Sequence, residues 1–94
     1  MAQVFTLPEI QDRLKELAKV HLEAPDTIQL DDDLVRDHGM DSIDHTDFEI
    51  ALEETYDQKI QPRLVQEWFR DRPLTLRNIS LLIAALQEKK AAID

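Results

Sequence analysis

Cysteine is absent from this chain of 94 residues, and glycine occurs only once. Without cysteine the chain has no disulfide, no thiolate metal ligand and no thiol nucleophile, so any thiol chemistry must be supplied from outside. Basic residues are scarce as well, because 11 Lys and Arg stand against 20 Asp and Glu, for a formal net charge of −9. This charge repels nucleic acid and anionic membrane surfaces and attracts basic protein partners.

Long hydrophobic segments are also missing. The longest apolar run extends from Leu81 to Leu86 and is too short to span a bilayer, and the N-terminus lacks the basic start and apolar core of a signal peptide. The sequence therefore predicts a cytoplasmic protein. Its length predicts one domain, residues 1–94, with a modest core and no room for a large enzyme cleft, so we expect it not to be an enzyme.

Helix signals cover most of the chain. Thr6 is suited to cap a first helix, since Glu9 three residues later completes a capping box, and the helix is expected to end near His21. Its apolar side chains fall on one face, as in a helix packed on a core. They are Ile10, Leu14, Leu17 and Ala18.

Residues 22–40 contain Pro25, three consecutive aspartates and Gly39, which predicts a long ordered loop. The apolar residues expected to hold this loop in place are Ile28, Leu30, Leu34 and Val35. A second helix is expected to follow, with Asp41 as N-cap and Asp44 three residues later. Carboxylates stabilise a helix at this end, where its dipole is positive.

Two prolines delimit a short third helix, because Pro62 suits a first helical position and Pro73 cannot continue the helix. Thr75 is expected to cap the last helix, whose apolar residues are Leu76, Ile79, Ile83 and Leu86. The predicted fold class is all-α, a small four-helix bundle with a long ordered loop between helices 1 and 2 and a short helix 3.

The second helix separates into two faces when each residue is advanced by 100°. One face is apolar and is expected to pack on the core, with Phe48, Ala51, Leu52 and Thr55, and Tyr56 at its edge. The opposite face combines two isoleucines with carboxylates, a composition typical of a docking surface for basic proteins. We predict that this docking face contains Ile43, Asp44, Thr46, Asp47, Ile50, Glu53, Glu54 and Asp57.

The chain has two serines. Ser42 falls in the first turn of the second helix, after the turn that contains Gly39, where a hydroxyl is expected to be accessible to an incoming enzyme. Ser80 is flanked by isoleucines and leucines, and we expect it to be a helix residue whose hydroxyl is satisfied internally. Ser42 is therefore the candidate modification site.

These residues together resemble the acyl carrier proteins. The sequence GMDSI at 39–43, followed by Asp44, Asp47 and ALEE at 51–54 and then by Tyr56 and Ile60, is similar to the family's G-x-D-S-[LI] motif and the acidic helix after it. In helix order the resemblance extends from Thr6 to about Leu86, but its specific part is 34–60. It implies a carrier with 4′-phosphopantetheine esterified to Ser42, beside Asp41 and Gly39.

The resemblance further implies how such a protein works. The prosthetic group brings a thiol that holds acyl groups as thioesters, and the carrier presents them to partner enzymes of fatty acid, lipid or polyketide-type biosynthesis. A phosphopantetheinyl transferase, which reads Asp41, would modify Ser42, and the carrier is expected to be a monomer. Acyl tails can fold back between the helices in this family, and Ala51, Ile60, Ala84 and Ala85 are expected to leave space for them.

Several positions depart from the family pattern. His38 stands where a leucine is usual, His45 where a small or apolar residue is common, and Glu49 where an aliphatic is usual. The stretch from Ile60 to Thr75 is longer than in a typical carrier. These departures suggest a specialised carrier. Within the longer stretch, Trp68 and Phe69 are interpreted as core residues, with a device that reads the cargo as the alternative.

Two functions from other classes do not fit the same residues. A hydrolase built on Ser42 and His45 lacks a third orienting group and a glycine-rich oxyanion turn. The acid run before Gly39 does not match a calcium loop, since no register places Gly at position six with Glu at position twelve. The remaining alternative is an unmodified all-helical interaction module that uses its acidic face only for docking.

Overall fold

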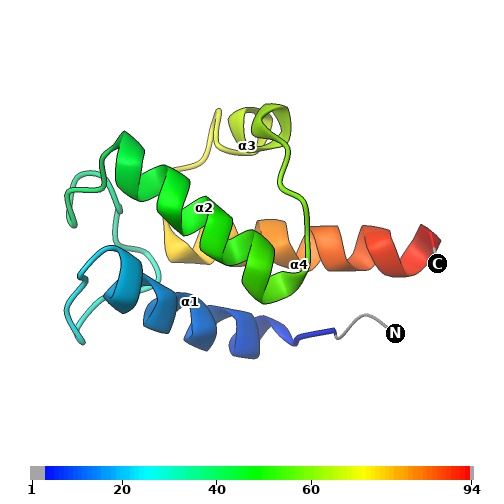
Figure 1. Cartoon of the computed structure of the whole chain (residues 1–94), viewed down its shortest axis with the longest axis horizontal. Helices are drawn as coiled ribbons and strands as arrows, with labels where there is room; N and C mark the ends of the chain where they lie inside the picture. The colour runs from blue at the N-terminus through cyan, green and yellow to red at the C-terminus, as the bar shows by residue number, and fades with distance from the viewer. Residues whose placement is uncertain (1–3, 94) are drawn as a thin grey trace.

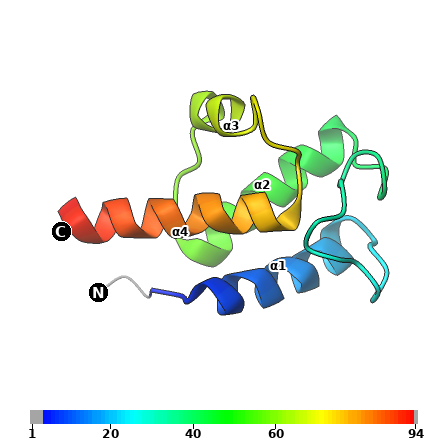
Figure 2. The ribbon, with the colours of Figure 1, turned by 180° about the vertical axis from the view of Figure 1, so that it is seen from behind.

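The computed structural model describes residues 4–93, and their regular structure is entirely helical. The helices are α1 (Leu7–His21), α2 (Ser42–Tyr56), α3 (Pro62–Trp68) and α4 (Leu76–Ile93). Helix α1 packs against both α2 and α4, and Figure 1 shows α1 and α4 running in opposite directions with α2 crossing them obliquely. Seen from behind in Figure 2, the short α3 lies on the side of the bundle away from α1. The predicted all-α bundle is confirmed.

Capping interactions fix where the helices begin. At α1 the Glu9 N–H donates to Thr6 Oγ1 at 3.3 Å, and the Thr6 N–H donates to the Glu9 carboxylate at 2.9 Å. Those hydrogen bonds also hold the pKa of Glu9 below its ordinary value. Helix α4 begins after Thr75, whose hydroxyl accepts from the Asn78 N–H at 3.1 Å. Both predicted caps are confirmed because capping depends on residues three positions apart.

An ordered loop was expected at residues 22–40, and the structure has one at residues 22–41, bonded to α4 and to the segment just before it. The buried Leu34 donates its N–H to the Leu74 carbonyl at 3.0 Å, and the Arg77 N–H donates to the Leu30 carbonyl at 3.0 Å. The Arg77 guanidinium forms a two-point contact with the Asp31 carboxylate, at 2.6 and 3.2 Å, and this hydrogen bonding lowers the pKa of Asp31. The loop therefore has a defined position relative to α4.

One expectation about this loop is wrong. Ile28 and Leu34 are buried and Leu30 is partly buried against the core, but Val35 is 54% exposed. The Asp33 carboxylate accepts the N–H of Val35 at 3.0 Å and closes a tight turn. Adjacent residues in such a turn point in different directions, so Leu34 faces the core and Val35 faces the solvent. The buried Met40 supplies the further apolar contact to the core.

The core joins the apolar faces of α1, α2 and α4 with the loop. Tyr56, at the end of α2, illustrates its packing: the ring meets Phe5 edge to face at 5.3 Å, and the buried hydroxyl donates to the Ile10 carbonyl at 3.3 Å. Burial of this phenol raises its pKa to about 12, because an ionised ring would lose its hydration. The apolar faces predicted for α1 and α4 are buried, apart from Leu86, which is partly buried.

None of the helices among residues 4–93 combines the length and the apolar character that crossing a membrane would require.

Ionisation of the buried Tyr56 should destabilise the fold at alkaline pH. The pKa of Tyr56 in the folded state lies above the ordinary value of 10. Its contribution to the free energy of unfolding is therefore complete below pH 10 and is lost as the pH rises toward about 12. Tyr56→Phe keeps the ring contact with Phe5 and removes the ionisable group. We expect the free energy of urea unfolding to fall more steeply between pH 9.5 and 11.5 in the wild type than in Tyr56→Phe, and parallel curves would contradict this account.

Candidate functional site

Ser42 occupies the first position of α2 and is exposed. The preceding residue, Asp41, is the N-cap: its carboxylate accepts the Asp44 N–H at 2.8 Å, and the Asp44 carboxylate accepts the Asp41 N–H at 3.3 Å. This reciprocal capping box fixes the backbone on both sides of Ser42. The hydroxyl is thus presented to solvent from a rigid helix terminus, in the position predicted from the sequence.

The turn before Ser42 depends on Gly39. This residue has φ +65°, in the left-handed region that L-amino acids with a side chain avoid, and its N–H donates to the Val35 carbonyl at 3.1 Å. A Cβ placed there would find no atom within 4 Å. The backbone conformation at position 39 therefore favours glycine, and the space beside this residue is open to an approaching protein.

The other serine has a different environment. Ser80 is fully buried in α4, where its hydroxyl donates to the Arg77 carbonyl at 2.6 Å and accepts from the Gln11 side-chain amide at 3.3 Å. The prediction of an internally satisfied hydroxyl is confirmed. Of the two serines in the chain, only Ser42 is accessible to a modifying enzyme.

The two predicted faces of α2 are observed. Phe48, Ala51, Leu52 and Tyr56 are buried, and Thr55 is half-buried. On the opposite side Ile43 is 71% exposed and Ile50 is 48% exposed. Thr46, Asp47, Glu54 and Asp57 are exposed around them. The two exposed isoleucines are seven residues apart, about two turns of the helix. They form an apolar ridge outside the core, which is typical of a contact surface.

Two carboxylates of this face accept hydrogen bonds from the backbone and so stabilise the fold. Asp44 belongs to the capping box, and the half-buried Glu53 accepts the Ile60 N–H at 3.0 Å, which fixes the turn between α2 and α3. Asp47 and Glu54 are exposed and flank Ile50, together with which they line an open groove beside α1. Asp47 and Glu54 are therefore carboxylates that this face presents to solvent beside Ile50.

His38, to which the sequence assigned no role, helps to hold the loop before Ser42. Its Nε2 lies 2.9 Å from the Asp32 carboxylate, and its side chain is only 10% exposed. The pKa of Asp32 is lowered, first by the hydrogen bond from the Gln29 N–H and then by the interaction with His38. His38 is therefore a nearly buried contact within the loop.

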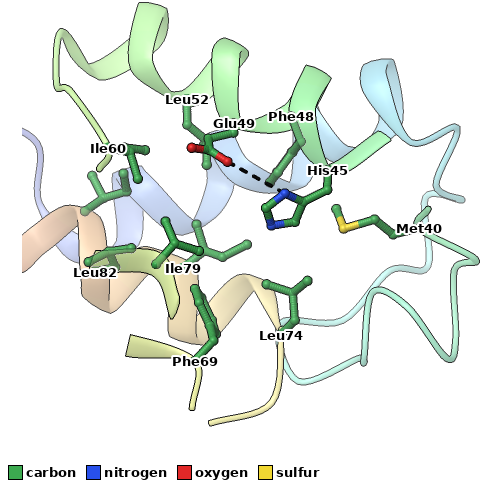
Figure 3. Close-up of a pocket in the computed structure, with 12 residues that line it drawn as sticks. Met40, His45, Phe48, Glu49, Leu52, Ile60, Phe69, Leu74, Ile79 and Leu82 are labelled. Carbon is green, nitrogen blue, oxygen red and sulfur yellow. Dashed lines mark ion pairs between the residues drawn. The ribbon is translucent and has the colours of Figure 1, made fainter. Parts of the chain in front are cut away.

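A small cavity lies between α2, α3 and α4 and is enclosed mainly by apolar side chains (Figure 3). Its volume is about 30 Å³. Of the residues expected to make space here, Ile60 lines the cavity, whereas Ala51 and Ala84 do not and Ala85 is exposed. The small side chains of α4 therefore do not form the cavity wall.

The wall of the cavity also contains two polar residues that the sequence did not place there. His45 and Glu49, two of the departures from the family pattern, both line the cavity from α2, with His45 Nδ1 3.6 Å from the Glu49 carboxylate (Figure 3). Their side chains are 38% and 25% exposed. Their spacing from Phe48 and Leu52 carries the only signal in the sequence, since it puts them at the margin of the buried face.

Trp68 and Phe69 have separate roles. Phe69 lines the cavity opposite α2. Trp68 is half-buried and attaches α3 to α4: its indole N–H donates to the Asn78 carbonyl at 3.0 Å, and the Arg72 guanidinium lies 4.1 Å from its ring centre. Neither residue is fully buried, and only Phe69 is positioned to contact a molecule in the cavity.

Replacement of Gly39 tests the backbone requirement. Gly39→Ala should lower the free energy of unfolding by about 1 kcal/mol, because the cost arises from the left-handed conformation and not from a clash. Gly39→Asn is the matched control, since asparagine tolerates this conformation and should lose less. Urea denaturation measures both changes, and an alanine variant as stable as the wild type would show that the turn does not need glycine.

The residues around Ser42 fit a phosphodiester-linked prosthetic group. The hydroxyl is exposed, it lies at the positive end of α2 where a phosphate is favoured, and an apolar cavity opens on another side of the same helix. The chemistry required of the chain is a single accessible alcohol, which Ser42 supplies.

Comparison with known families agrees with this geometry. The family model described as phosphopantetheine attachment site matches residues 8–70, which include all of α1 but its first residue, the loop, α2 and α3. Comparison with curated proteins gives no significant match, and neither does comparison with solved structures. The matched region is well over half of the chain. The chain therefore belongs to the phosphopantetheine attachment site family, as a carrier protein of the acyl carrier type with a covalently attached 4′-phosphopantetheine group.

Proposed function

We propose that this carrier bears its 4′-phosphopantetheine on Ser42 and presents acyl groups to enzymes of fatty acid, lipid or polyketide-type biosynthesis in the cytoplasm. The observation that carries the proposal is the exposed Ser42 hydroxyl, held by the Asp41 capping box at the start of a helix with an outward apolar and acidic face. The prosthetic group supplies a thiol that holds the acyl group as a thioester. The chain itself catalyses no reaction on that group.

Modification of Ser42 requires a partner enzyme and coenzyme A. A phosphopantetheinyl transferase would remove the hydroxyl proton, the serine oxygen would form a new phosphodiester bond, and the pyrophosphate bond of coenzyme A would break with release of adenosine 3′,5′-bisphosphate. The chain's contribution is to expose the nucleophile and fix its backbone. Asp41 lies next to Ser42 and would contact the transferase, and the open space beside Gly39 would let the transferase approach.

Docking of partners is proposed to use the outward face of α2. Asp47 and Glu54 would attract basic side chains, and Ile43 and Ile50 would provide a small apolar contact. Such a surface favours fast encounter and short residence, which suits a protein that must visit several enzymes. We further propose that the carrier acts as a monomer and as one domain.

Incubation with coenzyme A and a broad-specificity phosphopantetheinyl transferase should increase the intact mass by one phosphopantetheine. Ser42→Ala should show no increase, because the nucleophile is gone. Ser80→Ala is the matched control, since it removes the only other serine and should be modified like the wild type. An unchanged mass in wild type and Ser80→Ala would support the alternative of an unmodified interaction module and overturn the proposed function.

The rate of that modification should fall as salt is added, because the attraction to the transferase is between charges near water. The double variant Asp47→Asn/Glu54→Gln should reduce kcat/KM about fivefold at low salt, by loss of two exposed charge contacts. The control Asp12→Asn/Glu88→Gln alters the net charge equally, at exposed positions on α1 and α4. Equal losses in both double variants would mean that net charge, and not this face, governs docking.

A further inference from the structure

The cavity between α2, α3 and α4 has an unusual wall for a compartment that would receive an acyl chain. Every residue lining it is apolar except His45 and Glu49, which lie one helical turn apart on α2 (Figure 3). Both side chains are partly removed from water, with exposures of 38% and 25%. A polar pair at the margin of an apolar cavity will influence which groups can enter it.

An entering hydrocarbon would cover this pair and displace its water. Removing the hydration of a carboxylate or an imidazole without replacing its hydrogen bonds is unfavourable. A hydroxyl group avoids much of this cost, because it can donate to the Glu49 carboxylate and accept from an N–H of His45. The separation of 3.6 Å between His45 Nδ1 and the Glu49 carboxylate is longer than a good hydrogen bond, so the two groups do not satisfy each other fully.

The size of the cavity limits the length of the acyl group that can enter it. Its volume of about 30 Å³ is small, with space for about two water molecules. Enlarging it on the side of α3 would move that helix, which Trp68 attaches to α4 through the Asn78 carbonyl. The cavity thus matches the end of a short acyl group better than a long chain.

We propose that His45 and Glu49 select short acyl groups that carry a hydroxyl over hydrocarbon groups of the same shape. This inference rests on the proposed function, because the acyl group reaches the cavity only if Ser42 carries the prosthetic group. His45 and Glu49 then act as specificity residues of the carrier. They are separate from the docking face, since they lie on the side of α2 that faces α3.

The test compares two isosteric cargoes. The carrier is loaded with 3-hydroxybutyryl or 3-methylbutyryl phosphopantetheine from the corresponding coenzyme A thioesters, so that a hydroxyl in one replaces a methyl in the other. Cleavage of each thioester by hydroxylamine at pH 7 is measured relative to the same acyl pantetheine free in solution. We expect about fivefold greater protection of the hydroxylated cargo, the equivalent of one hydrogen bond. NMR should show shifts of the His45 ring signals with that cargo alone.

Variants of the pair identify the cause. His45→Leu/Glu49→Leu should reverse the preference and protect 3-methylbutyryl more, while Glu88→Leu, at an exposed position on α4, should leave the wild-type ratio unchanged. The amide spectrum of each variant checks that it is folded. Equal or better protection of 3-methylbutyryl in the wild type, or a double variant with the wild-type ratio, would overturn the proposal.

Two further outcomes are distinct. Stronger protection of 3-aminobutyryl than of 3-hydroxybutyryl would mean that Glu49 selects a cation, which would overturn the assignment to a hydroxyl. Failure of the chain to gain mass during loading would occur before any cleavage is measured. That result would refute attachment at Ser42, and with it the proposed function, instead of the selectivity alone.

Discussion

Attachment of the loop to α4 is the constraint on which the rest of the molecule depends. Leu34 is fully buried and bonds through its backbone to both Leu74 and Met40. Because Met40 is only two residues before Ser42, this anchor determines where α2 can begin. The Asp41 capping box then sets the direction of the helix. A serine in a free loop would have the same chemistry but no fixed orientation toward a partner enzyme.

Local features of the fold could be predicted because their causes are local. The caps at Thr6, Asp41 and Thr75 depend on side chains within three residues, and the structure has all three. The exposure of Ser42 and of the ridge at Ile43 and Ile50 also follows from helical periodicity once the start of the helix is known. The family motif added the prosthetic group, which periodicity alone does not imply.

Features that depend on packing between distant segments were missed. Val35 was expected to hold the loop but points outward, because the turn closed by Asp33 determines which of two adjacent apolar residues faces the core. His45 had no predicted place in a cavity wall, because that wall forms only where α3 and α4 approach α2. The direction of Val35 depends on the geometry of that turn. Spacing along α2 puts His45 at the margin of the buried face, but the cavity itself depends on where α3 and α4 lie.

The short α3 has no buried residues. Val65 packs partly buried against the core, and Trp68, the only tryptophan in the chain, bonds to α4 at the end of the helix. The indole is at the junction with α4, under the Arg72 guanidinium. Its fluorescence therefore reports on one place in the molecule. Any displacement of α3 that breaks the contact with Asn78 would alter the polarity around the ring, and the emission spectrum would record the opening without an added label.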